Sequence, residues 1–413
     1  MSRQHHQTVV VGAGIAGLSA AWHLNREGHP VTVLEAGDRP GGAIQTMRES
    51  GYLVEMGPNT LMVDDRVIEA FLADAVPETS LQFANSGADK RFIVRDGAPH
   101  AIPTGPLQAL TTKLWPKSAM FRVLKELFLP PYSGREEESL ADFVRRRLGR
   151  TMLDYAINPF VAGVYAGDPE TLSVKYGFPK LYNLEQRYGG SLIRGSMKLK
   201  KERKRTGQSH RAYLVSFPEG LSFLPETLAA ALNEPVRYNA AVTAIDRPGG
   251  GRFAVRFTKD GGEAAVEADS VILALPAHGI TGIRMAEPIE DRLGVLDEIE
   301  YPPVTSVALG FPRDAVAPPL DGFGMLVPEV EKREILGTLF SSTLFPGRAP
   351  DGHVLLTTFV GGTRQPDNAA LGEDALYEMT ARELQGLIGV SGEPSYRSIR
   401  RWPRAIPQYT IGY

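Results

Sequence analysis

Residues 8–42 read TVVVGAGIAGLSAAWHLNREGHPVTVLEAGDRPGG, and their pattern indicates the fold class of this chain. The stretch opens with the β-branched run Thr8–Val11, typical of a strand buried on both faces, and a glycine-rich turn follows directly. Apolar residues then recur at helical spacing up to Gly28, and a second strand is predicted over Val31–Leu34. A strand, a helix and a strand within about 30 residues form a βαβ unit, which predicts an open parallel sheet.

The spacing Gly12-x-Gly14-x-x-Gly17 between this strand and helix is typical of dinucleotide binding. Gly12 permits a tight turn, Gly14 lets the backbone approach a pyrophosphate, and Gly17 lets the helix pack on the strand. The amides and dipole at the start of the helix stabilise the phosphate charge. Glu35 ends the second strand, where its carboxylate is expected to accept hydrogen bonds from the adenosine ribose.

NAD and FAD both bind through this motif, and a second signal favours FAD. Arg39-Pro40-Gly41-Gly42 follows Glu35, so another loop can approach the pyrophosphate and the arginine offers positive charge. The run VLEAGDRPGGAIQT, residues 33–46, resembles the extended fingerprint of the flavin-containing amine oxidase superfamily. This resemblance implies FAD as the cofactor.

The composition is that of a folded protein without a strong overall charge. Of the 413 residues, 43% are hydrophobic and 23% charged, and the formal charge is −3, so we expect no nucleic-acid partner. The absence of cysteine excludes disulfides, thiolate catalysis and cysteine-bound metals, and we predict no metal site. The polar start of the sequence predicts no secretory signal and a cytoplasmic location, and no apolar run is long enough to span a membrane.

Farther along, the pattern predicts helices and strands in blocks. Helices with a wide apolar face are predicted within residues 99–132, and a loop is predicted for the basic run Arg194–Arg205. Short strands are predicted from Val236 onward, ending in a buried strand over Val271–Leu275. One helix is predicted over Asp374–Ile388.

From Thr8 to Tyr413 the chain resembles the protoporphyrinogen oxidase family. The runs that carry the resemblance are GYLVEMGPNT (51–60), KRFIVRDGAPHAIP (90–103), NPFVAGVYAGDPETLS (158–173), GFGMLVP (322–328), LGTLFSSTLFPGRAP (336–350), FVGGTRQP (359–366) and WPRAIPQY (402–409). The resemblance implies an FAD enzyme of porphyrin and haem biosynthesis. Such an enzyme removes six electrons from protoporphyrinogen IX, uses molecular oxygen as the acceptor and releases hydrogen peroxide. This chemistry depends mainly on positioning, so we predict no catalytic side chain.

The resemblance also implies the residues of the site. Arg91 is the expected anchor for a propionate, because its planar fork matches a carboxylate. The expected substrate-binding residues are Arg91, Gly163, Val304, Phe323 and Asn59. The expected cofactor-binding residues are Gly12, Gly14, Ile15, Ala16, Gly17, Glu35, Ala36, Arg39, Gly41, Gly42, Gly57, Pro58, Asn59, Val242 and Trp402.

The implied fold is mixed α/β, with a Rossmann-like FAD-binding domain, a β-sheet substrate domain and a helical insertion. We predict the FAD domain over residues 1–88 and 208–281, the substrate domain over 89–105 and 282–400, the insertion over 106–207, and a return to the FAD domain over 401–413. The resemblance implies that the insertion binds a membrane surface, and its lysines suit anionic lipid. The alternative is that its apolar residues form an ordinary core.

Other functions remain open from the sequence. Coproporphyrinogen III is the alternative substrate, and its two additional propionates would need further cations such as Arg194 and Arg211. A more distant alternative is an amine or carotenoid-type oxidoreductase, and a homodimer is a possible assembly. Family members continue past the position of Tyr413 with a segment that closes the FAD domain, so we expect weak FAD retention by this chain. A non-catalytic porphyrin-binding protein is the corresponding alternative.

Overall fold

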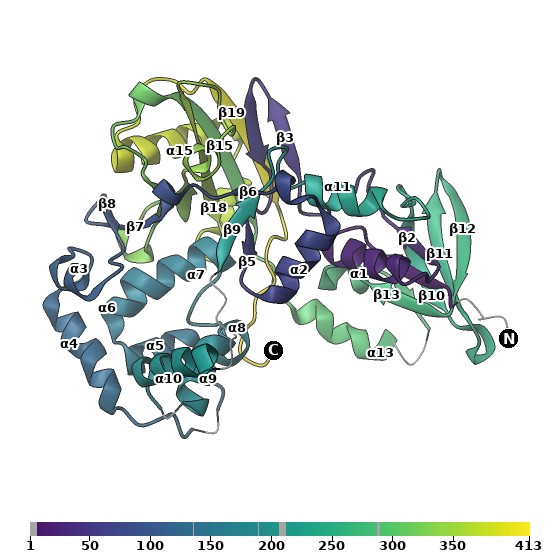
Figure 1. Ribbon diagram of the computed structural model, residues 1–413, viewed down its shortest axis with the longest axis horizontal. Helices are drawn as coiled ribbons and strands as arrows, with labels where there is room; N and C mark the ends of the chain where they lie inside the picture. The colour runs from purple at the N-terminus through teal and green to yellow at the C-terminus, as the bar shows by residue number, and fades with distance from the viewer. Residues whose placement is uncertain (1–5, 135, 189, 206–211, 287–289) are drawn as a thin grey trace. The chain divides into compact units, whose positions relative to one another are not determined.

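The computed structural model describes residues 6–134, 136–188, 190–205, 212–286 and 290–413 (Figure 1). The chain divides into two compact units. Unit 1 comprises residues 1–48, 53–83 and 213–299, and unit 2 comprises residues 49–52, 84–212 and 300–413. A hairpin of β3 (Thr46–Glu49) and β4 (Tyr52–Glu55) crosses the boundary between them in sequence. The predicted mixed α/β class is confirmed, whereas the predicted domain bounds stay a prediction; residues 401–413 group with unit 2.

Unit 1 is built on the predicted βαβ motif. β1 (Thr8–Val11) pairs in parallel with β2 (Val31–Leu34) and β13 (Ser270–Leu273), and α1 (Ile15–Arg26) connects β1 to β2. All residues of β1 are buried, as predicted, and so are all residues of β2. The predicted buried strand β13, at the edge of this sheet opposite β2, is instead half-buried throughout.

Smaller sheets and helices complete unit 1. One sheet has the order β12-β11-β10-β14 and another the order β5-β9-β6. The elements are β5 (Leu61–Val63), α2 (Arg66–Ala75), β6 (Gln82–Phe83), β9 (Tyr213–Ser216), α11 (Phe223–Ala230), β10 (Ala241–Asp246), β11 (Phe253–Lys259), β12 (Gly262–Ala268), α12 (Ala277–Ile280), β14 (Arg284–Met285) and α13 (Glu290–Leu293).

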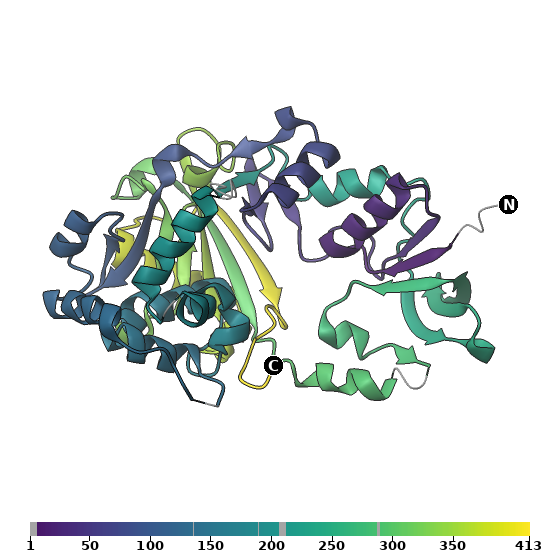
Figure 2. The same ribbon diagram turned by 60° about the horizontal axis from the view of Figure 1, so that its bottom comes forward.

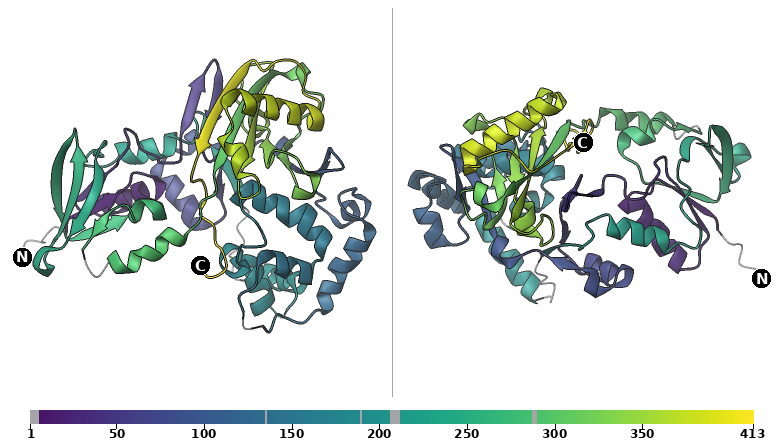
Figure 3. Two further views of the ribbon diagram at one scale, coloured as in Figure 1. Left: turned by 180° about the vertical axis from the view of Figure 1, so that it is seen from behind. Right: turned by 90° about the horizontal axis from the view of Figure 1, so that it is seen from above.

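Unit 2 is built on a seven-stranded sheet with the order β19-β15-β18-β17-β16-β7-β8, so that β19 (yellow in Figure 2) lies at one edge. The strands are β7 (Lys90–Arg95), β8 (Ala98–Ala101), β15 (Val304–Pro312), β16 (Gly322–Leu326), β17 (Gly337–Leu339), β18 (His353–Gly361) and β19 (Tyr396–Trp402). One face of the sheet packs against α15 (Glu373–Ile388), which confirms the predicted helix (Figure 3). The short helix α14 (Ser341–Leu344) precedes β18.

The remaining helices of unit 2 are α3 (Pro106–Thr111), α4 (Lys117–Lys125), α5 (Leu140–Arg147), α6 (Arg150–Met152), α7 (Asn158–Tyr165), α8 (Val174–Gly177), α9 (Pro179–Arg187) and α10 (Leu192–Arg205). All of them except α3 contribute residues to a second core. An ion network lies inside this core, where the buried Arg147 pairs with the buried Glu126 and Glu185. None of the helices among the described residues has the length and apolar character needed to cross a bilayer.

The prediction of a loop over Arg194–Arg205 is wrong, because these residues belong to α10. The carboxylate of Glu126 accepts hydrogen bonds from the backbone N–H groups of Leu192 (2.6 Å) and Ile193 (3.3 Å). It thereby satisfies donors that a helix otherwise leaves unpaired in its first turn. Lysine, arginine, glutamate and leucine also have high helix propensity, so the run remains helical although most of it is exposed.

Candidate functional site

The turn between β1 and α1 has the backbone shape that a pyrophosphate needs. Gly12 has a φ of 100°, and a Cβ added there would lie 2.7 Å from the carbonyl oxygen of Ala274. A Cβ on Gly17 would overlap the carbonyl oxygen of Gly12. Gly14, by contrast, has an ordinary extended φ of −69° and open space around its Cβ position. Gly12 and Gly17 therefore shape the turn, whereas Gly14 leaves room beside the start of α1 for a ligand.

Glu35 fixes the end of β2 to this turn. Its carboxylate accepts hydrogen bonds from the backbone N–H of Ala13 at 2.6 Å and of Gly37 at 2.8 Å. A carboxylate has about four acceptor positions, so these two bonds leave capacity for ribose hydroxyls. The half-buried Glu35 and the exposed Ala36 are thus held beside the glycine turn.

The loop that carries Gly41 and Gly42 lies against the first glycine turn. The backbone N–H of Gly41 donates to the carbonyl of Ala13 at 2.8 Å, and Gly14 forms a parallel bridge with Gly41. Gly41 and Gly42 both have positive φ values, 104° and 57°. Gly14, Gly41 and Gly42 therefore lie around one region at the start of α1, with Ile15 and Ala16 in its first turn.

Arg39 organises this second loop. Its guanidinium donates to the carbonyl oxygens of Pro40, Gly42 and Ile44 and to the side-chain oxygen of Gln45, at 3.0 to 3.1 Å. These bonds use both terminal nitrogens within the loop itself. A direct contact between Arg39 and phosphate stays a prediction.

The other predicted cofactor residues are distributed over both units. Val242 lies in β10 and packs in the same apolar cluster as Val11 and Leu34, beside the motif. The segment Gly57–Asn59 lies between β4 and β5, and the side chain of Asn59 donates to the carbonyl of Gly57 at 3.0 Å. Trp402 instead ends β19 in unit 2.

The sheet of unit 2 has a second face that α15 does not cover. Val307, Leu309 and Phe311 of β15 belong to the core that includes α15, so the alternate residues Val304 and Ser306 point to the opposite side. We call this side the open face, although α7 and α14 pack on parts of it through Ala162 and Ser341. The strand register places further residues on this face. Phe359 and Arg400 lie beside Ser306, and Trp402 lies beside Val304. Gly337 pairs with Phe359 and Leu326 with Gly337, and the adjoining row contains Leu339, Gly324 and Arg91.

The structure brings four of the predicted substrate residues to this sheet or against it. The guanidinium carbon of Arg91 lies 5.3 Å from the centre of the Phe323 ring, a cation–π arrangement. Val304 packs with Ala162 and Ala166, one on α7 and the other just after it. A Cβ on Gly163 would overlap the side chain of Leu326, so here the glycine makes room for Leu326. Asn59, in unit 1, is not part of this group.

Sequence reasoning missed three apolar residues of the open face. Leu326, Leu339 and Phe359 are half-buried, whereas most of their strand neighbours are buried. All three lie in runs that carried the family resemblance, but their strand alternation alone gives no reason to prefer them to ordinary core residues. The register across β16, β17 and β18 supplies that reason.

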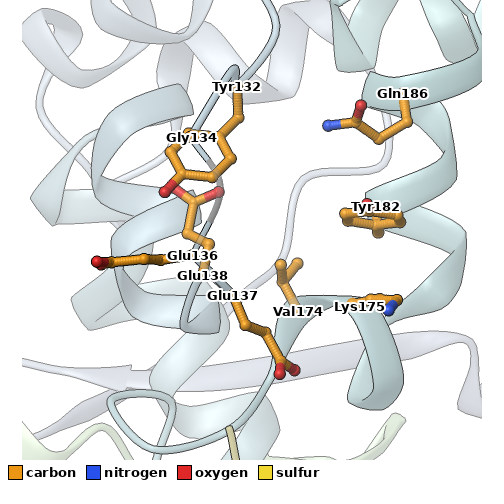
Figure 4. A pocket seen from close by; sticks show the side chains of 9 residues that line it. All are labelled: Tyr132, Gly134, Glu136, Glu137, Glu138, Val174, Lys175, Tyr182 and Gln186. Atoms are coloured by element: carbon orange, nitrogen blue, oxygen red, sulfur yellow. The ribbon is translucent and has the colours of Figure 1, made fainter. Parts of the chain in front are cut away.

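Two cavities lie elsewhere in unit 2. The first, about 230 Å³, has Glu136, Glu137 and Glu138 on one side and Lys175, Tyr182 and Gln186 on the other (Figure 4). The second, about 360 Å³, is lined among others by Arg145, Arg150, Asp154, Asp168 and Glu329. Neither cavity contains a residue predicted for the cofactor or the substrate.

Residues 15–413 match the family model for flavin-containing amine oxidoreductases. The chain belongs to this family. It is a flavoprotein oxidoreductase, and the dinucleotide motif of unit 1 indicates that its flavin is FAD.

Three individual proteins are similar to this chain over nearly its whole length. Protoporphyrinogen oxidase 2 of Arabidopsis thaliana is 33% identical, over 98% of this chain and 85% of the relative. Coproporphyrinogen III oxidase of Bacillus subtilis (strain 168) is 27% identical, over 100% of this chain and 89% of the relative. The crystal structure of a protein from Exiguobacterium sp. 255-15 is similar with a TM-score of 0.79 and 26% identity, covering 100% of this chain and 89% of that one.

Proposed function

We propose that this chain oxidises a porphyrinogen to the porphyrin, with protoporphyrinogen IX as the principal substrate and molecular oxygen as the final acceptor. One porphyrinogen and three molecules of oxygen would give one porphyrin and three molecules of hydrogen peroxide. The similarity to protoporphyrinogen oxidases over nearly the whole chain supports this proposal. When bound, FAD supplies the two-electron acceptor at which substrate oxidation and oxygen reduction meet.

The open face of unit 2 is the observation that carries the proposal. Leu326, Leu339 and Phe359 offer apolar surface for a tetrapyrrole and exclude water from it. Arg91 lies at one side of this surface, where the Phe323 ring supports its guanidinium. Its fork can hold a propionate in place and so fix which part of the macrocycle reaches the flavin.

Aerobic turnover tests the proposal. Purified protein loaded with FAD is mixed with protoporphyrinogen IX, and porphyrin fluorescence and hydrogen peroxide are measured together. We expect three molecules of peroxide for each porphyrin, above the rate of a protein-free control. Porphyrin binding without turnover would favour the non-catalytic alternative, and turnover of amines instead would contradict the proposal.

Coproporphyrinogen III is the second candidate substrate. It is supported by the similarity to coproporphyrinogen III oxidase and by a second arginine, Arg400, on the open face. Of the cations considered from sequence, Arg194 is exposed on α10, and Arg211 lies outside the described residues. Rates with the two porphyrinogens under identical conditions separate the candidates.

We also propose that the helical part of unit 2 binds an anionic membrane surface. Large apolar side chains are exposed on consecutive segments, namely Leu107, Leu110, Phe121, Leu124 and Phe128. Lys113, Lys117 and Lys125 belong to the same stretch of sequence and suit acidic headgroups. We expect flotation with vesicles that contain phosphatidylglycerol and reduced flotation for Phe121→Ser combined with Phe128→Ser. A cytoplasmic location and a homodimer stay predictions.

A further inference from the structure

Arg400 differs from its neighbouring arginines in having no polar partner among the described residues. Its Nε is buried without a hydrogen-bond acceptor, and no carboxylate of the described chain lies within ion-pair distance of its guanidinium. By contrast, Arg397 pairs with Glu393 at 2.8 Å, and Arg401 donates to two backbone carbonyl oxygens. A half-buried cation without such a partner is costly, and a ligand can offset that cost.

The position of Arg400 on the sheet shows which way it faces. In the register of β15 and β19, Arg400 lies beside Ser306 and Trp402 lies beside Val304. Arg400 is therefore on the open face, while Arg397 and Arg401 point to the side covered by α15. The guanidinium carbon of Arg400 lies 4.6 Å from the centre of the Trp402 ring. This contact holds the charged group over the aromatic face without using its hydrogen-bond donors.

Arg91 and Arg400 lie on opposite sides of the open face. Arg91 is in β7 and Arg400 is in β19, and the order of the sheet separates these strands by five strand spacings, about 24 Å along a flat sheet. The apolar residues Leu326, Leu339 and Phe359 belong to strands between them. Two arginines on either side of an apolar surface match a macrocycle that carries carboxylates on two opposed edges.

We propose that Arg400 is a second carboxylate-binding residue, which makes the site able to accept a tetracarboxylate porphyrinogen such as coproporphyrinogen III. The proposal rests on the proposed function and extends it. Arg91 binds the propionates that protoporphyrinogen IX and coproporphyrinogen III share. Arg400 binds the additional propionates, which take the place of vinyl groups on the opposite edge. Its effect is therefore confined to the substrate that carries them.

The test compares Arg400→Met with a matched variant of the same strand, Arg397→Met, which removes an equal charge from the other face. With FAD-loaded protein we expect Arg400→Met to raise KM for coproporphyrinogen III about tenfold, the loss expected for one charge-assisted hydrogen bond. We expect KM for protoporphyrinogen IX to change less than twofold, and kcat and flavin content to remain unchanged. Arg400→Lys should recover part of the lost affinity for coproporphyrinogen III. Arg397→Met should leave KM for coproporphyrinogen III unchanged.

Binding of the stable porphyrins, followed by the Soret absorption band, gives the same comparison without turnover. We expect Arg400→Met to weaken coproporphyrin III about tenfold and protoporphyrin IX hardly at all. Equal changes for both porphyrins, no change for either, or loss of flavin from the variant would overturn the role of Arg400. If Arg400→Met selectively weakens coproporphyrin III binding but the parent protein oxidises neither porphyrinogen, the proposed function fails while the role of Arg400 stands.

Discussion

The nucleotide motif of unit 1 and the open face of unit 2 use different parts of the polypeptide to make a site. In unit 1, the turns within residues 12–17 and 35–42 present backbone N–H groups and glycines without side chains, and the side chain of Glu35 holds the first turn together. On the open face, side chains from β7, β16, β17, β18, β15 and β19 converge from distant points in the sequence. Added side-chain atoms are therefore expected to disrupt the nucleotide motif, whereas loss of side chains is expected to disrupt the open face.

The largest effect is expected for Gly17→Ala, compared with Gly14→Ala in the same motif. The methyl group on residue 17 would meet the backbone carbonyl of Gly12, which cannot rotate away, so we expect no folded FAD-bound protein. The methyl group on residue 14 enters open space, so the unfolding free energy of the apoprotein should change by less than about 0.5 kcal/mol. Gly14→Ala should nevertheless weaken FAD binding at least tenfold, because the pyrophosphate is predicted to approach the backbone at this position.

Flavin content after gel filtration and chemical unfolding of the apoproteins check this pair. A folded Gly17→Ala variant with full flavin content would show that the turn tolerates a side chain. Full FAD affinity in Gly14→Ala would show that the pyrophosphate binds elsewhere.

A smaller effect is expected for Arg147→Met, which tests whether charges hold the helical core of unit 2 together. Arg147 is fully buried and donates to the carboxylates of Glu185 and Glu126, so its loss removes the cation beside the buried Glu126 and leaves Glu185 with its other partner, Arg146. We expect a loss of about 3 kcal/mol in the free energy of unfolding. Arg145→Met, on the exposed side of the same helix, should cost less than about 1 kcal/mol although Arg145 pairs with Asp142. Urea unfolding of both variants provides the comparison, and equal losses would contradict it.

Arg91→Met tests the open face itself. Removal of the guanidinium should raise KM for protoporphyrinogen IX about tenfold and leave flavin content unchanged, because one charge-assisted contact is lost. Lys90→Met is the matched control, since Lys90 is the preceding residue and pairs with Asp321 on the surface. Steady-state kinetics measure both, and the anchor role of Arg91 is excluded if the two variants behave alike.

The smallest effect concerns pH. Burial by itself would raise the pKa of Glu185, but hydrogen bonds from Arg146 and Arg147 outweigh burial and hold that pKa below its usual value. A carboxylate with a lowered folded-state pKa contributes stability above the ordinary glutamate value, and this contribution is lost as the pH falls through the folded pKa. We expect unfolding free energy to decrease with acidification in this window, and less steeply in Glu185→Gln. Equal slopes for parent and variant would assign the acid sensitivity to other carboxylates.

The two sites also differ in how far the sequence predicts them. Gly12, Gly14, Gly17 and Glu35 lie within one βαβ unit, so their spacing along the chain determines their spacing in space. Leu326, Leu339 and Phe359 are brought onto one face by the strand register, which no local sequence pattern contains. The helix over Leu192–Arg205 was missed for a similar reason, because the group that satisfies its first turn is Glu126, about 66 residues earlier.

The most direct test of porphyrinogen oxidation by this chain is anaerobic reduction of its bound flavin by a porphyrinogen. FAD-loaded protein is mixed with protoporphyrinogen IX without oxygen, and the visible flavin bands are followed with time. We expect rapid bleaching in the parent protein, bleaching that needs higher substrate concentrations in Arg91→Met, and return of the bands when oxygen is admitted. Bound flavin that neither protoporphyrinogen IX nor coproporphyrinogen III bleaches would contradict the proposed porphyrinogen oxidation.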